Sequence, residues 1–130
     1  MTIAATFDQR DGSKANLQTV ENVSLERSQE LVRRLDEKKY TEVLLQQGEA
    51  TFSIAGGSGR YFVSAFTEDE RSFILTNPTR DESQTEKLHA AGQNIELPSN
   101  QIVDLAPTLC ALREFFSQGP RFNDGQWAES

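Results

Sequence analysis

At 130 residues, the sequence has the length of one domain of ordinary size, which predicts a single domain over residues 1–130. Its 20 acidic residues outnumber its 13 basic ones, and the net charge of -7 would repel nucleic-acid phosphates and anionic membrane surfaces, so we expect neither as a partner. The single cysteine excludes an intramolecular disulfide, and no stretch approaches the roughly 20 apolar residues of a membrane-spanning helix.

The N-terminal segment gives two expectations. Its first residues have neither the basic start nor the long apolar run of a signal peptide, which predicts a cytoplasmic protein. Residues 1–21 contain one β-prone segment, residues 3–7, and are compatible with a first strand or with a loose tail. Residues 8–13 follow this segment and are rich in Asp, Gly and Ser, which favour turns.

A first helix is expected from Ser24 onward. Apolar residues recur there at helical spacing, at Leu25, Leu31, Val32 and Leu35. Ser24 precedes them and is a good N-cap, because its hydroxyl oxygen can accept a hydrogen bond from the first turn of the helix.

The middle of the chain changes to a period of two. Residues 43–45 and, after a short turn, residues 50–54 alternate between apolar and polar side chains, which predicts a β-hairpin. Residues 61–66 and 72–76 add two further strands, so we expect a meander of four antiparallel strands. The turns of this meander are expected at residues 47–49, 56–59 and 68–71.

The C-terminal part predicts a long loop, a short strand and a second helix. Residues 77–94 are polar and show no sustained period, which is typical of a loop. Residues 95–97 have the pattern of a short strand. Apolar residues at helical spacing then predict a helix from near Asp104 to Gln118.

A helix stop and a last strand complete the expected fold. Gly119 followed by Pro120 ends the second helix, and the tail around Trp127 is compatible with one more strand. Together these elements predict an α+β fold, in which an antiparallel meander of about four to six strands packs against two helices.

Residue types that often carry chemistry occur singly in this sequence. His89 is the only histidine, and no two other ligand-type residues flank it at metal-ligand spacing. Cys110 lies within the second predicted helix beside its apolar stripe, where a thiol usually packs rather than reacts. Residues 56–60 lack the Gly-Lys-Ser/Thr ending of a phosphate-binding loop and precede a strand. We therefore predict no catalytic residue, no metal site and no cofactor.

Acidic residues gather at two places and are the first candidates for partner contacts. Glu68, Asp69 and Glu70 fall in a predicted turn, and Asp81 and Glu82 fall in the predicted loop. Either these carboxylates are ordinary solvated side chains, or they form anionic patches that meet a basic partner.

Aromatic side chains on the strands are the second set of candidates. Their default position is the core. If the helices cover only one face of the sheet, some of Phe62, Phe66 and Ile74 are exposed on the other face, where an apolar patch usually marks a binding surface. We take Tyr61 and Phe66 as candidate anchors, because aromatic side chains supply much of the affinity of such surfaces.

The C-terminal third resembles a known family. Ile-Glu-Leu-Pro at residues 95–98, Leu-Arg-Glu-Phe-Phe-Ser-Gln-Gly at residues 112–119 and Trp-Ala-Glu at residues 127–129 follow a helix and a strand meander. This order is similar to the first-numbered immunity-protein family of bacterial polymorphic toxin systems. The resemblance implies a non-catalytic antidote in the cytoplasm that binds and inhibits the toxin domain encoded beside it. Toxins paired with this family include nucleases and deaminases, whose basic grooves suit an acidic inhibitor.

Two other functions remain open at this point. A non-catalytic regulatory or scaffold domain would differ from an antidote mainly in what the neighbouring gene encodes. A small enzyme that uses loop carboxylates would need a deep pocket holding at least two of them.

Overall fold

The computed structural model describes residues 2–11, 14–118 and 126–129, and every structural statement below concerns these residues. In chain order, the elements are β1 (Ala4–Asp11), β2 (Lys14–Val20), α1 (Leu25–Arg33), β3 (Glu42–Gln47), β4 (Ala50–Gly57), β5 (Arg60–Phe66), β6 (Ser72–Leu75), β7 (Thr85–Ala90), β8 (Gln93–Pro98), the short 3₁₀ helix η1 (Ser99–Gln101), α2 (Leu105–Gln118) and β9 (Trp127–Glu129).

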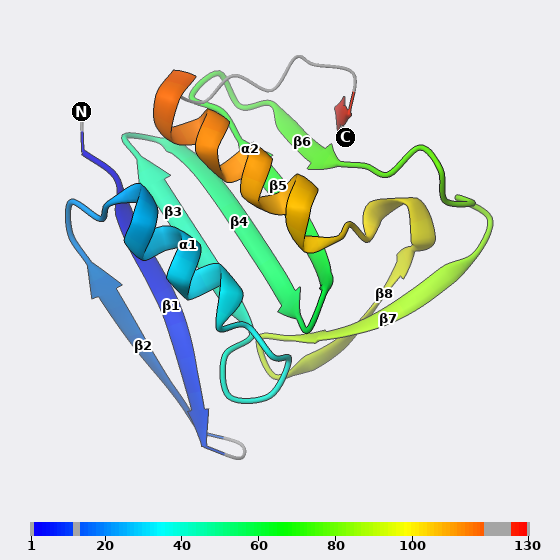
Figure 1. Ribbon diagram of the computed structural model, residues 1–130, viewed down its shortest axis with the longest axis horizontal. Coiled ribbons are helices and arrows are strands. Elements are labelled where there is room, and N and C mark those ends of the chain that lie inside the picture. The colour runs from blue at the N-terminus through cyan, green and yellow to red at the C-terminus, as the bar shows by residue number, and fades with distance from the viewer. Residues whose placement is uncertain (1, 12–13, 119–125, 130) are drawn as a thin grey trace.

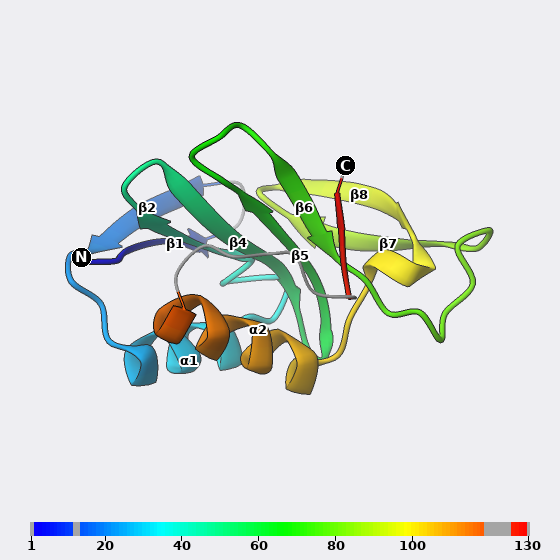
Figure 2. The same ribbon diagram turned by 90° about the horizontal axis from the view of Figure 1, so that it is seen from above.

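A seven-stranded antiparallel sheet forms the body of the described chain, and the two helices cover one of its faces (Figures 1 and 2). The strand order is β2-β1-β3-β4-β5-β6-β9, so β3 to β6 form a meander that the β1–β2 hairpin and β9 extend on either side. Strands β7 and β8 form a separate two-stranded sheet. The predicted α+β class, with an antiparallel meander and two helices, is confirmed, and the sheet is wider than predicted.

Helix α1 begins where the sequence predicts. The Oγ of Ser24 accepts a hydrogen bond from the backbone N–H of Arg27 at 3.0 Å, which satisfies one of the free donors of the first turn. Leu31 and Val32 on this helix, and Leu35 just after it, are buried. The apolar stripe read from the sequence is therefore the face that packs on the sheet.

The core lies between the helices and the sheet. Phe52 and Ile54 of β4 are completely buried, and so is Leu112 of α2. The rings of Phe52 and Phe115 lie 5.1 Å apart between centroids, at an interplanar angle of 34°. Because successive residues of a strand point to opposite faces, burial of one face produces the period of two in the sequence.

Within the first 21 residues, the described segments Ala4–Asp11 and Lys14–Val20 form two paired strands, β1 and β2. The turn predicted from residue 8 onward is wrong over residues 8–11, because β1 continues to Asp11; residues 12–13 lie outside the described residues. Strand β2 has no apolar alternation, since six of its seven residues are exposed. It forms because it pairs with β1 along its whole length, which a period cannot reveal.

The loop predicted over residues 77–94 is wrong in its second half. Strand β7 occupies Thr85–Ala90 and pairs with β8, which begins at Gln93 and includes the predicted short strand. Only Leu88 and Ala90 of β7 are buried. Two buried side chains among polar neighbours give too weak a pattern for a strand to be predicted.

The C-terminal elements agree with the sequence where they are described. Helix α2 runs over Leu105–Gln118, and Pro107 lies in its first turn, where a missing N–H costs no hydrogen bond. The predicted stop at Gly119 and Pro120 lies outside the described residues. Strand β9 pairs with β6, with Trp127 opposite Leu75, which confirms the last strand.

A buried carboxylate joins β1 to the segment that enters β3. The Oδ1 of Asp8 accepts hydrogen bonds from the backbone N–H groups of Thr41 at 2.7 Å and Glu42 at 3.1 Å. Its Oδ2 accepts from the hydroxyl of Thr41 and from Nε of Arg10, the latter at 2.7 Å. The same Thr41 hydroxyl oxygen accepts a hydrogen bond from the N–H of Ala91 at 3.1 Å. This cluster thus fixes the tip of the β7–β8 hairpin against the sheet.

The sheet face opposite the helices is called the open face here (Figure 2). Small and large side chains alternate on it, and one continuous row of cross-strand neighbours runs from β1 to β9. The members of the row are Thr6, Leu44, Ser53, Ser64, Ile74 and Ala128.

Candidate protein-binding surface

The turn between β5 and β6 holds three of the predicted acidic residues at the surface. The backbone N–H of Thr67 donates to the carbonyl of Arg71 at 2.9 Å, and the Thr67 hydroxyl oxygen accepts from the N–H of Arg71 at 3.2 Å. The Thr67 hydroxyl in turn donates to Asp69. This closed turn presents Glu68, Asp69 and Glu70, which are all exposed.

The turn between β3 and β4 lies directly beside this one. A Cβ atom placed on Gly48 would lie 2.9 Å from Oε1 of Glu68. The neighbouring Glu49 is exposed and adds a fourth carboxylate to the same end of the sheet. We call Glu49, Glu68, Asp69 and Glu70 the acidic end. Glu49 was not among the predicted residues, although a four-stranded meander already places its first and third turns at one end of the sheet.

Of the two predicted aromatic anchors, only Phe66 is at the surface. Phe66 is 41 % exposed and ends β5 next to the acidic end. Tyr61 is 2 % exposed, and its hydroxyl oxygen accepts a hydrogen bond from the N–H of Gly59 at 3.4 Å. The prediction of Tyr61 as an anchor is therefore wrong, because strand alternation turns it to the helix side and Phe66 to the open face. Phe62 and Ile74 share the open face and are half-buried.

Asp81 and Glu82 lie elsewhere, in the loop between β6 and β7 at the side of the molecule (Figure 1). Both are exposed. The Oδ1 of Asp81 accepts hydrogen bonds from the backbone N–H of Ser83 at 2.9 Å and from its hydroxyl at 2.8 Å. These bonds lower the pKa of Asp81, so its carboxylate is charged at neutral pH. The structure therefore separates the predicted acidic residues into two groups.

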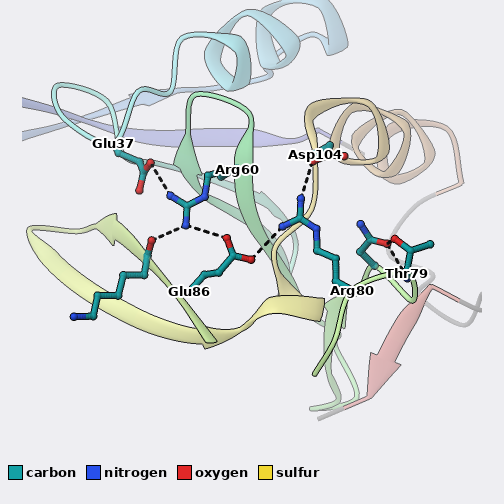
Figure 3. Close-up of polar contacts among 8 residues, drawn as sticks. Glu37, Arg60, Thr79, Arg80, Glu86 and Asp104 are labelled. Atoms are coloured by element: carbon teal, nitrogen blue, oxygen red, sulfur yellow. Dashed lines mark hydrogen bonds and ion pairs between the residues drawn. The ribbon is translucent and has the colours of Figure 1, made fainter. Parts of the chain in front are cut away.

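A row of alternating charges fixes the loop and the β7–β8 hairpin to the rest of the fold (Figure 3). Arg80 lies 3.2 Å from Glu86 and 3.2 Å from Asp104, which precedes α2. Arg60 of β5 lies 3.4 Å from Glu86 and 3.8 Å from Glu37. We call these five residues the charge ladder. Its members come from five separate segments, so it holds the second acidic group in a defined place.

Two main-chain bonds reinforce the charge ladder. Nη2 of Arg60 donates to the carbonyl of Lys87 at 2.8 Å. The backbone N–H of His89 donates to Oε1 of Glu37 at 2.9 Å. Both bonds reach β7, so the ladder orients the strand as well as its side chains.

Replacing Arg60 with alanine should loosen the hairpin more than the whole fold. Each ladder pair is partly exposed, and such pairs contribute about 0–1 kcal/mol to stability. We expect backbone amides of β7 and β8 to exchange hydrogen about fivefold faster, while global unfolding changes by less than about 1 kcal/mol. Hydrogen exchange read by mass spectrometry measures both.

Arg27→Ala is the matched control for this exchange experiment. Arg27 pairs with Glu30 at 3.2 Å on the exposed side of α1, so its loss removes one surface ion pair without touching the hairpin. Equal exchange in β7 and β8 for the two variants would show that the ladder does not hold the hairpin.

The glycine-rich run is structural. In the Gly57 conformation, with φ of +149°, a Cβ atom would lie 2.4 Å from the backbone nitrogen of Asp36 and 2.6 Å from the carbonyl oxygen of Leu35. The N–H of Ser58 donates to that same carbonyl at 3.2 Å. Gly57 thus allows the backbone of Leu35 and Asp36, just after α1, to contact β4. The glycine-rich run forms the β4–β5 turn, as the sequence predicts.

The single histidine and the single cysteine lie in different parts of the fold. Nδ1 of His89 lies 3.1 Å from Oδ1 of Asn94 within the β7–β8 hairpin. Cys110 is exposed on α2 rather than packed in the apolar stripe, with Sγ 3.9 Å from Oε1 of Glu114. Over residues 2–11, 14–118 and 126–129, no group of three His, Cys, Asp or Glu side chains is arranged to hold a metal ion.

Comparison with known proteins assigns no family, since no protein-family model matches the chain and no curated protein matches it. In the described part of the chain, neither helix has the length and apolar character needed to cross a membrane.

Proposed function

We propose that this chain is a non-catalytic antidote, which acts in the bacterial cytoplasm by binding and inhibiting a toxin domain encoded next to it. The toxin is one that acts on nucleic acid. Such enzymes bind phosphates through basic surfaces, and an acidic protein that covers this surface excludes the substrate. The resemblance of residues 95–129 to an immunity-protein family supports the same function.

The acidic end beside Phe66 is the observation on which this proposal depends. Its four carboxylates come from two adjacent turns, and none forms an ion pair within 4.0 Å with another described residue. Their charge is therefore available to a partner. Charges of one sign on neighbouring turns accelerate association with a basic surface, and an exposed aromatic ring beside them supplies apolar contact area.

The open face gives the partner a preformed area to contact. Ser53 and Ser64 are neighbours at its centre, with Phe66 at one end and Ile74 at one side. The strands beneath are paired on both sides from β1 to β6, so little conformational entropy is lost when a partner binds. Asp81 and Glu82 provide a second, separate acidic contact held in place through the charge ladder.

Charge reversal at the acidic end tests the proposal directly. The triple variant Glu68→Lys, Asp69→Lys, Glu70→Lys should bind the C-terminal domain encoded by the neighbouring gene with an association rate about tenfold lower or more at low salt. The salt dependence of the rate should also decrease. Surface plasmon resonance at two ionic strengths measures both, and survival of cells that co-express the two proteins gives the functional readout.

The matched control carries the same change in charge on another surface. Glu21→Lys, Glu26→Lys, Glu30→Lys alters three exposed residues at and before α1 and should leave binding nearly unchanged. If both triple variants weaken binding equally, only the net charge matters and the acidic end is not the contact. Turnover of a substrate by the purified protein, lost on replacing one carboxylate or Cys110, would contradict a non-catalytic function.

A further inference from the structure

Strand β2 is a long free edge of the seven-stranded sheet (Figure 1). Its residues pair one-to-one with β1, from Lys14 with Asp11 to Val20 with Ala5. Six of its seven residues are exposed. The strand therefore offers an outer row of backbone N–H and C=O groups to which another strand can add.

The side chains of β2 do not protect this edge. Edge strands are commonly blocked by charged residues, by proline, by a bulge or by being very short. Between Lys14 and Glu21, β2 contains neither charge nor proline, and its regular pairing with β1 leaves no bulge. At its centre Leu17 is 69 % exposed, well above the 41 % of Phe66.

The opposite edge of the sheet is protected in two of these ways. Strand β9 is only three residues long. Arg71 donates to both carboxylate oxygens of Glu129, at 3.0 Å and 2.7 Å, and these bonds lower the pKa of Glu129, so the pair is charged at neutral pH. Strand addition is therefore expected at β2 and not at β9.

We propose that β2 pairs antiparallel with β2 of a second copy of this chain, so that one continuous sheet runs through a symmetric dimer. The two-fold axis passes through Leu17. Residues opposite each other in an antiparallel pair share a face of the sheet, and a two-fold axis normal to the sheet preserves the faces. Residue 17 then faces residue 17 of the second copy, residue 15 faces residue 19, and residue 16 faces residue 18.

The side chains on both faces of this pairing are complementary. Thr19 lies on the open face, with its Oγ1 3.2 Å from Oγ1 of Thr6, so alternation places Leu17 and Ala15 there too. Leu17 meets Leu17 of the second copy, with Ala15 and the methyl group of Thr19 on either side. On the helix side, the amide of Asn16 meets that of Gln18. Nε2 of Gln18 already donates to Oε1 of Gln9 at 2.8 Å, so its Oε1 is the atom that can accept from Asn16 of the second copy.

Charge also favours this antiparallel pairing over a parallel pairing and over a strand from an unrelated protein. The antiparallel direction brings the Lys14 end of each strand to the Glu21 end of the other, whereas a parallel pair would bring like charges together. Each copy carries a net charge of -7, so the uncharged strand is where two copies approach with least repulsion. A strand from an unrelated protein would not need this symmetry of side chains about Leu17.

The association of the purified chain tests the proposal. Sedimentation velocity over rising concentration should show the wild type passing from monomer to dimer, while Leu17→Lys stays monomeric because it sets two ammonium groups against each other on the axis. Ala128→Lys, which adds the same charge to the exposed surface of β9, should still dimerise. A wild type that stays monomeric, or loss of the dimer in Ala128→Lys, would overturn the proposal. Circular dichroism checks that each variant is folded.

Cysteine cross-linking tests the register. In a Cys110→Ser background, Leu17→Cys places two thiols opposite each other across the axis, at a Cα separation of about 4.5–5.5 Å, which suits a disulfide. Air oxidation should convert Leu17→Cys to a covalent dimer, whereas Ala15→Cys should remain uncoupled because it faces Thr19 of the second copy. Equal coupling of the two variants would overturn the register. No toxin is present in either experiment, so the result does not depend on the proposed function.

Discussion

Replacing Gly57 with alanine should lower the free energy of unfolding by about 3 kcal/mol or more, since backbone strain and overpacking each cost roughly 1–3 kcal/mol. The new Cβ atom would meet the backbone nitrogen of Asp36 at 2.4 Å and the carbonyl carbon of Leu35 at 2.5 Å. Both atoms belong to the main chain and cannot rotate away. The segment after α1 must then separate from β4, which breaks the bridge between Asp36 and Gly57. Urea unfolding followed by circular dichroism measures the loss.

Gly59→Ala separates this contact from the general cost of replacing a glycine. Gly59 also has a positive φ, of +88°, but a Cβ atom there would meet nothing within 4 Å. We expect a loss of only about 1–2 kcal/mol, the usual cost of a left-handed backbone with a side chain. Equal losses in the two variants would mean that the close contact with Leu35 and Asp36 is not what makes a side chain at position 57 destabilising.

Asp8→Asn should be the most damaging change of a single charge, with a loss of about 3–5 kcal/mol. The side chain of Asp8 is completely buried and that of Arg10 is 13 % exposed, so the variant leaves a nearly buried guanidinium without its counterion. It also replaces one acceptor oxygen by an NH₂ group that cannot accept hydrogen bonds from Thr41. Thermal and urea unfolding measure the loss. Asp11→Asn, at the exposed end of the same strand, is the control and should change stability by less than about 0.5 kcal/mol.

The same carboxylate predicts how stability depends on pH. Burial acts to raise the pKa of Asp8, but the hydrogen bonds from Thr41, Glu42 and Arg10 together lower it below the ordinary value of 3.8. A carboxyl group with a lowered pKa stabilises the fold above its unfolded pKa and loses this contribution as the pH falls through its folded pKa. Wild-type stability should therefore decrease below about pH 4, and more steeply than that of Asp8→Asn. Equal slopes would show that Asp8 is not the titrating group.

Glu42 has the opposite effect on how stability depends on pH. Burial, and secondarily the charge of Asp8, raise the pKa of Glu42, so ionised Glu42 destabilises the fold at neutral pH. In Asp8→Asn the second of these causes is removed. Asp8 and Glu42 therefore contribute with opposite sign to the dependence of stability on pH.

Elements that bury one face could be predicted from the sequence, and elements that do not could not. Phe52 and Ile54 alternate with polar residues because the helices cover one face of β4, and this alternation identified the meander. Strand β2 has no buried face, and β7 buries only Leu88 and Ala90. Both strands depend on pairing with a neighbour, and backbone hydrogen bonds leave little trace in the order of side chains.

Only part of the candidate binding surface could be predicted from the sequence. Acidic turns could be predicted, because Glu68, Asp69 and Glu70 are consecutive in the sequence. The side to which Tyr61 and Phe66 point depends on which face of β5 the helices cover, and alternation alone is equally consistent with either. The charge ladder was not predicted, since Arg60 and Glu86 are 26 residues apart and meet only when the hairpin folds back.

The contact between Trp127 and Phe52 provides an intrinsic fluorescent probe of the sheet edge. Trp127 is the only tryptophan, and its ring meets that of Phe52 edge-on, with centroids 6.0 Å apart and an angle of 72°. It lies on the strand that closes one margin of the sheet. Indole emission depends on the polarity around the ring. The intrinsic fluorescence of Trp127 therefore reports whether β9 is paired with β6, without any attached dye.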